Sequence, residues 1–208
     1  MLKSIGVVVA VAALSPGASA QTPKAATYIT DEEVKTVNRQ PGVDRTIRVV
    51  DIGNENLAVG IIHRSPSSGG TMGGGTARGA APQGETCGEQ SSGTPATDLP
   101  TGITHDAQTE GYVIVSGGGT LITGGHIVNG RKSAPNTEVN TTLNGPSCSG
   151  LIAGSDVVKK TVKAGDIIII PAGVPHGWAD ITDHVDYLSI RPSDHVLQAG
   201  YVHPSIKR

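Results

Sequence analysis

The chain has 208 residues, a formal net charge of −2, 29 glycines, 13 prolines and no phenylalanine. This near-neutral charge does not favour a nucleic acid or a membrane surface as a partner. Because there are only one tryptophan and four tyrosines, the core has to come mainly from valine, isoleucine, leucine and alanine. An aliphatic core with so many turn residues indicates an all-β protein. The length fits one domain with generous loops.

The first twenty residues have the pattern of a secretory signal peptide. Lys3 supplies the positive start, Ile5 to Leu14 is an apolar run, and Ala18 to Ala20 gives a small-residue cleavage pattern. The run is too short to span a bilayer, although a retained membrane anchor is the alternative. We expect a signal peptide at 1–20, a single mature domain at 21–208, and a secreted or periplasmic protein without membrane contact after cleavage.

One helix and a series of short strands are expected along the mature chain. Thr30 followed by Glu33 has the capping-box pattern, so a helix is predicted over Asp31 to Asn38, with Val34 and Val37 facing inward. β-rich runs between turn residues predict strands at about 45–52, 57–64, 110–115, 120–123, 126–128, 157–162, 167–170, 176–181 and 185–191. The glycine-rich residues 116–119 read as a turn. The four isoleucines at 167–170 read as a fully buried strand.

Two polar stretches interrupt these strands, and each contains a cysteine. Residues 65–102 are rich in glycine, serine, threonine, proline and alanine, and a loop of this length is either functional or disordered. Cys87 lies in this insertion, and Cys148 lies in the second stretch, at about 129–150. In an exported chain the two form a plausible disulfide, with two free thiols as the alternative. A disulfide would fix the insertion as a lid or rim over the sheet.

The pattern at residues 165–178 predicts a strand and a stiff turn that hold one imidazole at the end of the strand. Pro171 ends the isoleucine run, Gly173 permits a turn, and a second proline stiffens the approach to His176. Earlier in the chain, the two-residue period of a strand can place His105 and Glu110 on one face across a bend. The combination of two histidines and a glutamate is the strongest chemical signal in the sequence.

These residues resemble the two sequence motifs of the cupin superfamily. The second motif is matched by Gly165, Pro171, Gly173 and His176, with Asp180 at its asparagine position, and the end of the first by His105, Glu110 and Gly117. The chain departs from the pattern at Ile103, where the family has the first histidine of a His-x-His pair. The opening glycine of the first motif is also out of register. The resemblance covers about Leu57 to Arg191.

The resemblance implies an all-β fold of the cupin type, a double-stranded β-helix or jelly-roll barrel, here with a short N-terminal helix. In the family a divalent metal is held by three histidines and one glutamate. The ligands carried over are His105, Glu110 and His176, and the metal would be Fe, Mn, Zn, Ni or Cu. Two histidines and one carboxylate also form the facial triad of non-haem Fe(II) oxygenases. Alternatively, Ile103 weakens metal binding and the site has become a ligand pocket.

Other residues are weaker candidates. Glu110 is a ligand first and a proton acceptor second, and Tyr112 is a candidate proton-transfer group that lines the pocket or belongs to the core. His63 ends an alternating run and is expected to point into the barrel, as a fourth ligand or an acid–base group. A strand-end histidine bonded to neighbouring backbone is the alternative. Arg191 would hold a substrate carboxylate or form a surface ion pair.

The function expected is that of an exported metal-binding cupin. Its reaction would be that of an Fe- or Mn-dependent oxygenase, an isomerase or a lyase acting on a small oxygenated organic compound. Whether the chain is an enzyme stays open, because a non-catalytic small-ligand-binding cupin is the alternative. A structural protein without an open cavity is a third reading. The resemblance also implies a homodimer.

Overall fold

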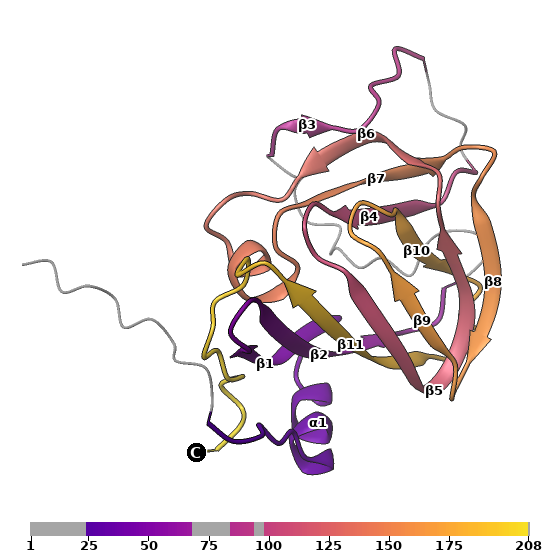
Figure 1. The fold of residues 1–208 in the computed structure, drawn as a ribbon. Helices are drawn as coiled ribbons and strands as arrows, with labels where there is room; N and C mark the ends of the chain where they lie inside the picture. The colour runs from indigo at the N-terminus through magenta and orange to yellow at the C-terminus, as the bar shows by residue number, and fades with distance from the viewer. Residues whose placement is uncertain (1–23, 68–83, 94–97, 208) are drawn as a thin grey trace, which may run out of the picture.

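A computed structural model describes residues 24–67, 84–93 and 98–207. Within these residues the strands form one eleven-stranded sheet with antiparallel pairing, and it curves into a barrel with one short α-helix outside it (Figure 1). The predicted signal peptide at 1–20 and much of the insertion at 65–102 lie outside the described residues. No helix in the described part has the length and apolar character needed to cross a membrane.

The elements follow one another in short steps along the chain. They are α1 (Asp31–Asn38), β1 (Asp44–Asp51), β2 (Asn56–Arg64), β3 (Thr86–Cys87), β4 (Thr101–His105), β5 (Glu110–Thr123), β6 (His126–Lys132), the π-helical turn η1 (Val139–Leu143), β7 (Ser147–Ala153), β8 (Val158–Lys163), β9 (Ile167–Ile170), β10 (His176–Ala179) and β11 (Val185–Ser193). The all-β class with a short N-terminal helix is confirmed. Most predicted strands are also found, with small shifts at their ends.

The long strand β5 joins the two layers of the barrel. Its first half pairs with β9 and β11, and its second half pairs with β8 and β10. The turn predicted at 116–119 is wrong, because β5 continues through these glycines. Gly117 has a positive φ of 63°, and the register with β11 shifts beside it. The glycines therefore bend the strand from one layer into the other and do not reverse it.

The strand of four isoleucines, β9, is present as predicted, but it is not fully buried. Ile170 is only 2% exposed, whereas Ile167 and Ile169 are 71% and 74% exposed. Among the described strands β9 pairs only with β5, so it is an edge strand whose alternate side chains face outward. A run of identical apolar residues has no alternation, and the sequence pattern therefore conceals which side chains face out.

The helix α1 covers part of the outer surface of the barrel. Its capping box is confirmed, since the Thr30 side chain accepts a hydrogen bond from the Glu33 backbone and the Glu33 side chain accepts one from the Thr30 backbone. Val37 is fully buried against Ile47 of β1 and Ile61 of β2. The face of β2 with Val59 and Ile61 is therefore apolar and packs against the helix, while Ile62 on the other face joins the core of the barrel.

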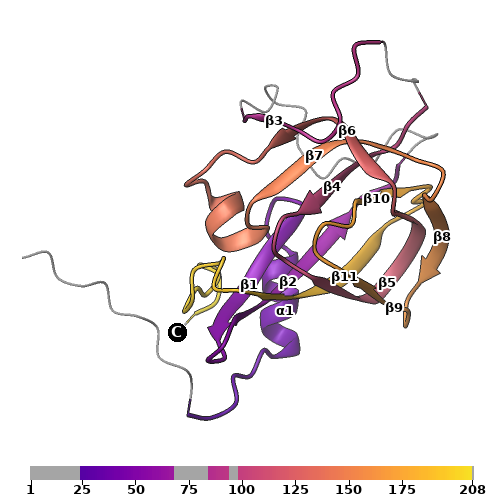
Figure 2. The ribbon, with the colours of Figure 1, turned by 45° about the horizontal axis from the view of Figure 1, so that its top comes forward.

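The disulfide expected between Cys87 and Cys148 is present. It connects β3 with β7, and β3 also pairs with β6 at the edge of the sheet (Figures 1 and 2). The described part of the insertion is thus attached to the barrel by a covalent bond and a short strand pairing. A disulfide that spans 61 residues restricts the unfolded chain and stabilises the fold by about 2–4 kcal/mol.

Candidate metal centre

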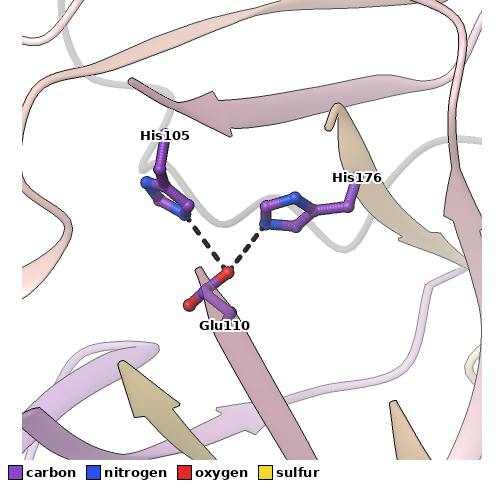
Figure 3. Close-up of side chains that lie close together, drawn as sticks. All are labelled: His105, Glu110 and His176. Atoms are coloured by element: carbon purple, nitrogen blue, oxygen red, sulfur yellow. Dashed lines mark ion pairs between the residues drawn. The ribbon is translucent and has the colours of Figure 1, made fainter. Parts of the chain in front are cut away.

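Three titratable side chains from three strands meet inside the barrel. His105 ends β4, Glu110 begins β5 and His176 begins β10 (Figure 3). Each is at most 3% exposed. Oε2 of Glu110 lies 3.2 Å from Nε2 of His105 and 3.0 Å from Nε2 of His176. Among the described residues this is the one group of three histidine, cysteine or carboxylate side chains whose ligand atoms all lie within 4.8 Å.

Local backbone structure explains why these residues converge. The Cα register pairs His176 of β10 with Ile103 of β4, two residues before His105. Gly173, at a positive φ of 82°, donates its backbone N–H to the carbonyl of His105 over 2.8 Å. The turn after the isoleucine strand is therefore bonded directly to the end of β4, and the stretch at 165–178 does hold its imidazole against a second histidine.

The hydrogen bonds of His176 favour a cation between the three side chains. Its Nδ1 lies 3.0 Å from the carbonyl oxygen of Val174, which can only accept, so Nδ1 carries the proton. In a neutral imidazole the Nε2 lone pair then faces Oε2 of Glu110 at 3.0 Å, and that oxygen is also an acceptor. Either a second proton or a metal ion removes this repulsion. Metal-binding histidines commonly donate their other ring N–H to a backbone carbonyl in this way.

The two oxygens of Glu110 face different partners. Oε1 accepts hydrogen bonds from the Ser189 hydroxyl and from Nε of Arg191, each at 2.9 Å. Oε2 accepts one from the Tyr112 hydroxyl at 2.8 Å and faces both histidines. Burial by itself raises the pKa of Glu110, but Arg191 and the histidines outweigh burial and hold this pKa well below its usual range. Glu110 is therefore a carboxylate that presents one oxygen to the histidine pair.

Arg191 is part of this interior network, which corrects the sequence-based expectations for it. Its guanidinium is 1% exposed and donates to Oδ2 of Asp44 at 2.5 Å and to the carbonyl of Leu143 at 3.0 Å, in addition to Glu110. Burial lowers the pKa of Arg191, but the carboxylates of Asp44 and Glu110 prevail and raise it. Arg191 is neither a surface ion pair nor a group open to a substrate carboxylate, because its donors are occupied.

A cavity of about 260 Å³ opens beside the three residues. Its walls include Ile103, Tyr112, Trp178 and Tyr187, together with His105, Glu110 and His176. The rings of Tyr112 and Tyr187 lie 4.4 Å apart, and those of Tyr187 and Trp178 lie 5.2 Å apart. Burial is the main cause that raises the pKa of Tyr112 well above 10, and the Glu110 charge adds to it, so its hydroxyl remains a proton donor.

Ile103 lines this cavity beside the histidines. The position where the family pattern has a further histidine therefore carries an aliphatic side chain that faces the same space. His105, Glu110 and His176 line one side of the cavity. The ligand set available to a metal there is two imidazoles and one carboxylate. Such a set leaves coordination positions for a small molecule.

His63 lies apart from this cavity, so the expectation that it points into the barrel is wrong. Its Nδ1 lies 2.7 Å from Oδ1 of Asp186, its side chain is 41% exposed, and the next residue, Arg64, lines the cavity in its place. The alternating run before His63 faces the helix α1, as Ile61 shows, and not the interior. The apolar alternation before His63 therefore marks the outer face of β2, which packs on α1, and not the face toward the barrel interior.

Three residues that shape the site are not predicted by the sequence motifs. Asp44 and Arg64 line the cavity, and Ser189 bonds to Glu110. None belongs to a motif, since they come from β1, β2 and β11. The available signal was alternation within β11, which places Tyr187, Ser189 and Arg191 on one face.

No family model matches the chain, and no curated protein matches it either. An uncharacterized protein with a double-stranded β-helix domain from Klebsiella pneumoniae is 16% identical, over 83% of this chain and 94% of that chain, with a TM-score of 0.38. A cupin protein from Bacteroides fragilis is 16% identical, over 73% of this chain and 78% of that one, with a TM-score of 0.30. A recombinant oxalate oxidase in complex with glycolate is 11% identical, over 76% and 55%, with a TM-score of 0.34.

All three TM-scores lie below 0.5, so the likeness is distant and no ligand or activity is transferred from these proteins. The barrel is defined by the strand pairing of this chain, and the candidate site by its own contacts.

Proposed function

We propose that this chain is a metal-binding protein of the cupin type, with one divalent transition metal held by His105, Glu110 and His176. The convergence of three buried ligand atoms within 4.8 Å of one another carries the proposal. The hydrogen bonding of His176 supports it, because a protonated Nδ1 leaves the Nε2 lone pair aimed at a carboxylate oxygen. Two imidazole nitrogens and one carboxylate oxygen suit Fe, Mn, Zn, Ni or Cu. Harder cations such as Ca²⁺ and Mg²⁺ prefer ligand sets made only of oxygen.

The residues around the triad prepare it for a small oxygenated compound. A bound divalent metal supplies Lewis-acid character that polarises an oxygen of the ligand. Arg191 and Ser189 fix Glu110 so that Oε2 faces the histidines. The Tyr112 hydroxyl donates to this same oxygen and lies on the cavity wall, where it can hold a proton next to the ligand. We propose an oxygenase, isomerase or lyase reaction for this arrangement.

A non-catalytic ligand-binding module is the second candidate, and Ile103 is the observation that favours it. An aliphatic side chain in place of a ligand lowers metal affinity and adds apolar wall to the cavity. In this case small-molecule affinity survives the changes Glu110→Ala and His176→Ala, because it then depends on the cavity walls and not on the metal.

Metal titration of chelator-treated protein tests the main proposal. Isothermal calorimetry with Zn²⁺ and Mn²⁺ is expected to give one site per chain, and the site is lost in His105→Ala, Glu110→Ala and His176→Ala. His126→Ala is the matched control, since His126 is a half-exposed histidine that pairs with Glu89. Equal binding by the wild type and the three site variants contradicts a metal on this triad.

Domain organisation, export and oligomeric state are three further proposals. We propose a single domain over 21–208 that is exported to the periplasm or secreted, and the disulfide supports export because such bonds persist in oxidising compartments.

We also propose a homodimer. The exposed isoleucines of the edge strand β9 support it, because natural edge strands of this kind are usually covered. Light scattering of the purified protein tests this, and a monomer mass contradicts it.

A further inference from the structure

Two polar side chains on the cavity wall form no hydrogen bond within the part of the chain that the structure describes. They are Asn144, which follows η1, and Ser149 of β7, and both residues are half-buried and line the cavity. Neither the amide of Asn144 nor the hydroxyl of Ser149 is enclosed in the interior without a partner. Both groups are therefore accessible, and they can bond to a molecule in the cavity.

The strand pairing places Ser149 on the same face of the sheet as the metal triad. Ser149 of β7 pairs in register with Ile103 of β4, and Ile103 pairs in register with His176 of β10 (Figure 1). Side chains of residues directly opposite each other on antiparallel strands lie on one face, so these three residues form a row inside the barrel. Neighbouring strands lie about 4.8 Å apart, and the Cα atoms of Ser149 and His176 are thus separated by roughly 10 Å.

The backbone at Asn144 is fixed by the same arginine that orients Glu110. Nη1 of Arg191 donates to the carbonyl oxygen of Leu143 over 3.0 Å, and its Nε donates to Glu110. Asn144 follows Leu143 directly and ends the π-helical turn, with its own N–H bonded to the carbonyl of Val139 over 2.7 Å. Turns of this kind occur frequently at functional sites. One guanidinium therefore connects the carboxylate of the metal triad to the segment that carries Asn144.

We infer that the cavity binds a small hydroxylated compound, with one oxygen-bearing group at the metal triad and a further hydroxyl group held by Asn144 and Ser149. The inference rests on the proposed metal function. The amide and the hydroxyl are uncharged, and each offers both a donor and an acceptor. A hydroxyl group on the ligand also donates and accepts, so it can use both properties. A cavity of about 260 Å³ restricts this ligand to a few carbon atoms.

Calorimetric titration of Zn²⁺-loaded protein with two matched pairs of acids tests this inference. The pairs are glycerate with lactate, and 2,4-dihydroxybutyrate with 2-hydroxybutyrate. Within each pair the group that binds the metal is the same, and one member has an additional hydroxyl at the far end. In at least one pair the member with this hydroxyl is expected to bind about fivefold or more tightly, since a neutral hydrogen bond contributes about 0.5–1.5 kcal/mol.

Variants assign this preference to the two side chains. Asn144→Leu and Ser149→Ala are each expected to reduce the affinity ratio within that pair about two- to tenfold. Binding of the acid without the far hydroxyl, and the uptake of one Zn²⁺, are expected to be unchanged. Thr161→Ala is the matched control, because Thr161 is an exposed hydroxyl residue of β8 that does not line the cavity, and it is expected to keep the wild-type ratio.

Three results overturn the inference while the proposed function stands. The first is zinc-loaded wild type that shows no preference for the hydroxylated acid in either pair or binds none of the four acids. The second is a wild-type affinity ratio in Asn144→Leu or in Ser149→Ala with zinc still bound. The third is an equal loss of the ratio in Thr161→Ala. Failure of the wild type to take up zinc contradicts the proposed function itself, and the inference falls with it.

Discussion

Arg191 and Glu110 form a buried ion pair in which the arginine Nε donates to the glutamate Oε1 over 2.9 Å. The pair occupies the oxygen that faces away from the histidines and leaves Oε2 directed at them. The same guanidinium also holds Asp44, so one cation fixes both carboxylates on the cavity wall. The orientation of the candidate metal ligand thus depends on a residue of another strand, 81 positions away in sequence.

Loss of this ion pair is expected to destabilise the protein strongly. Arg191→Met leaves the buried carboxylate of Glu110 and the partly buried carboxylate of Asp44 without their cation, and breaking a buried pair in this way typically costs about 3–5 kcal/mol. Urea unfolding of metal-free protein measures the loss. Arg48→Met, which removes a peripheral pair with Glu33, is expected to cost about 1 kcal/mol or less. Equal losses of unfolding free energy in the two variants would contradict a larger contribution of the buried pair to stability.

Asp186 is expected to make a contribution to the stability of the fold that is lost at acid pH. Burial raises the pKa of Asp186, but hydrogen bonds from His63 and Ser116 prevail and lower it below its ordinary 3.8. A carboxyl whose pKa is depressed by folding stabilises the fold above its unfolded pKa, and this contribution is lost as the pH falls through the folded value. The stability difference between the wild type and Asp186→Asn is therefore expected to shrink as the pH falls below about 4. A difference that does not shrink in this acid range refutes the assignment.

Restoring the missing histidine is expected to strengthen metal binding. Ile103 lines the cavity beside the triad and pairs in register with His176, so Ile103→His places an imidazole next to the other ligands. Calorimetry is expected to show Zn²⁺ affinity at least about tenfold higher, which corresponds to about 1.4 kcal/mol. Ile103→Val retains an aliphatic wall and should bind as the wild type does. Unchanged affinity in Ile103→His means that this side chain does not reach the metal position.

The disulfide is expected to stabilise the barrel through the attachment of β3 to β7. The double variant Cys87→Ala/Cys148→Ala should lose about 2–4 kcal/mol in urea unfolding, because the bond closes a loop of 61 residues. Reductant should produce a similar loss in the wild type and no change in the double variant. Wild-type stability that is the same with and without reductant argues against the bond.

The sequence predicts the fold class and the three polar residues of the site because motif spacing and strand composition are local properties. Proline, glycine and histidine at 171–176 specify a strand end and a turn whatever surrounds them. Burial depends instead on which strands become neighbours. The four isoleucines of β9 show no alternation, and their edge position follows only from pairing with β5. Their exposure was therefore hidden from the pattern.

The residues that line the cavity cannot be predicted from the sequence for a similar reason. His63 and Arg64 are adjacent, and the choice of which faces inward depends on α1, which makes the outer face of β2 apolar. Arg191 has the sequence context of a strand end near the surface, yet it is buried because Asp44 and Glu110 come from strands that fold around it. Such contacts join β1, β5 and β11, and no local pattern records them.

Anomalous X-ray diffraction from crystals of Zn²⁺-loaded protein tests directly whether the three residues bind a metal. We expect one strong anomalous peak per chain, bounded by Nε2 of His105, Nε2 of His176 and Oε2 of Glu110. A peak at surface histidines, such as His63 beside Asp186 or His126 beside Glu89, without one inside the barrel would contradict it.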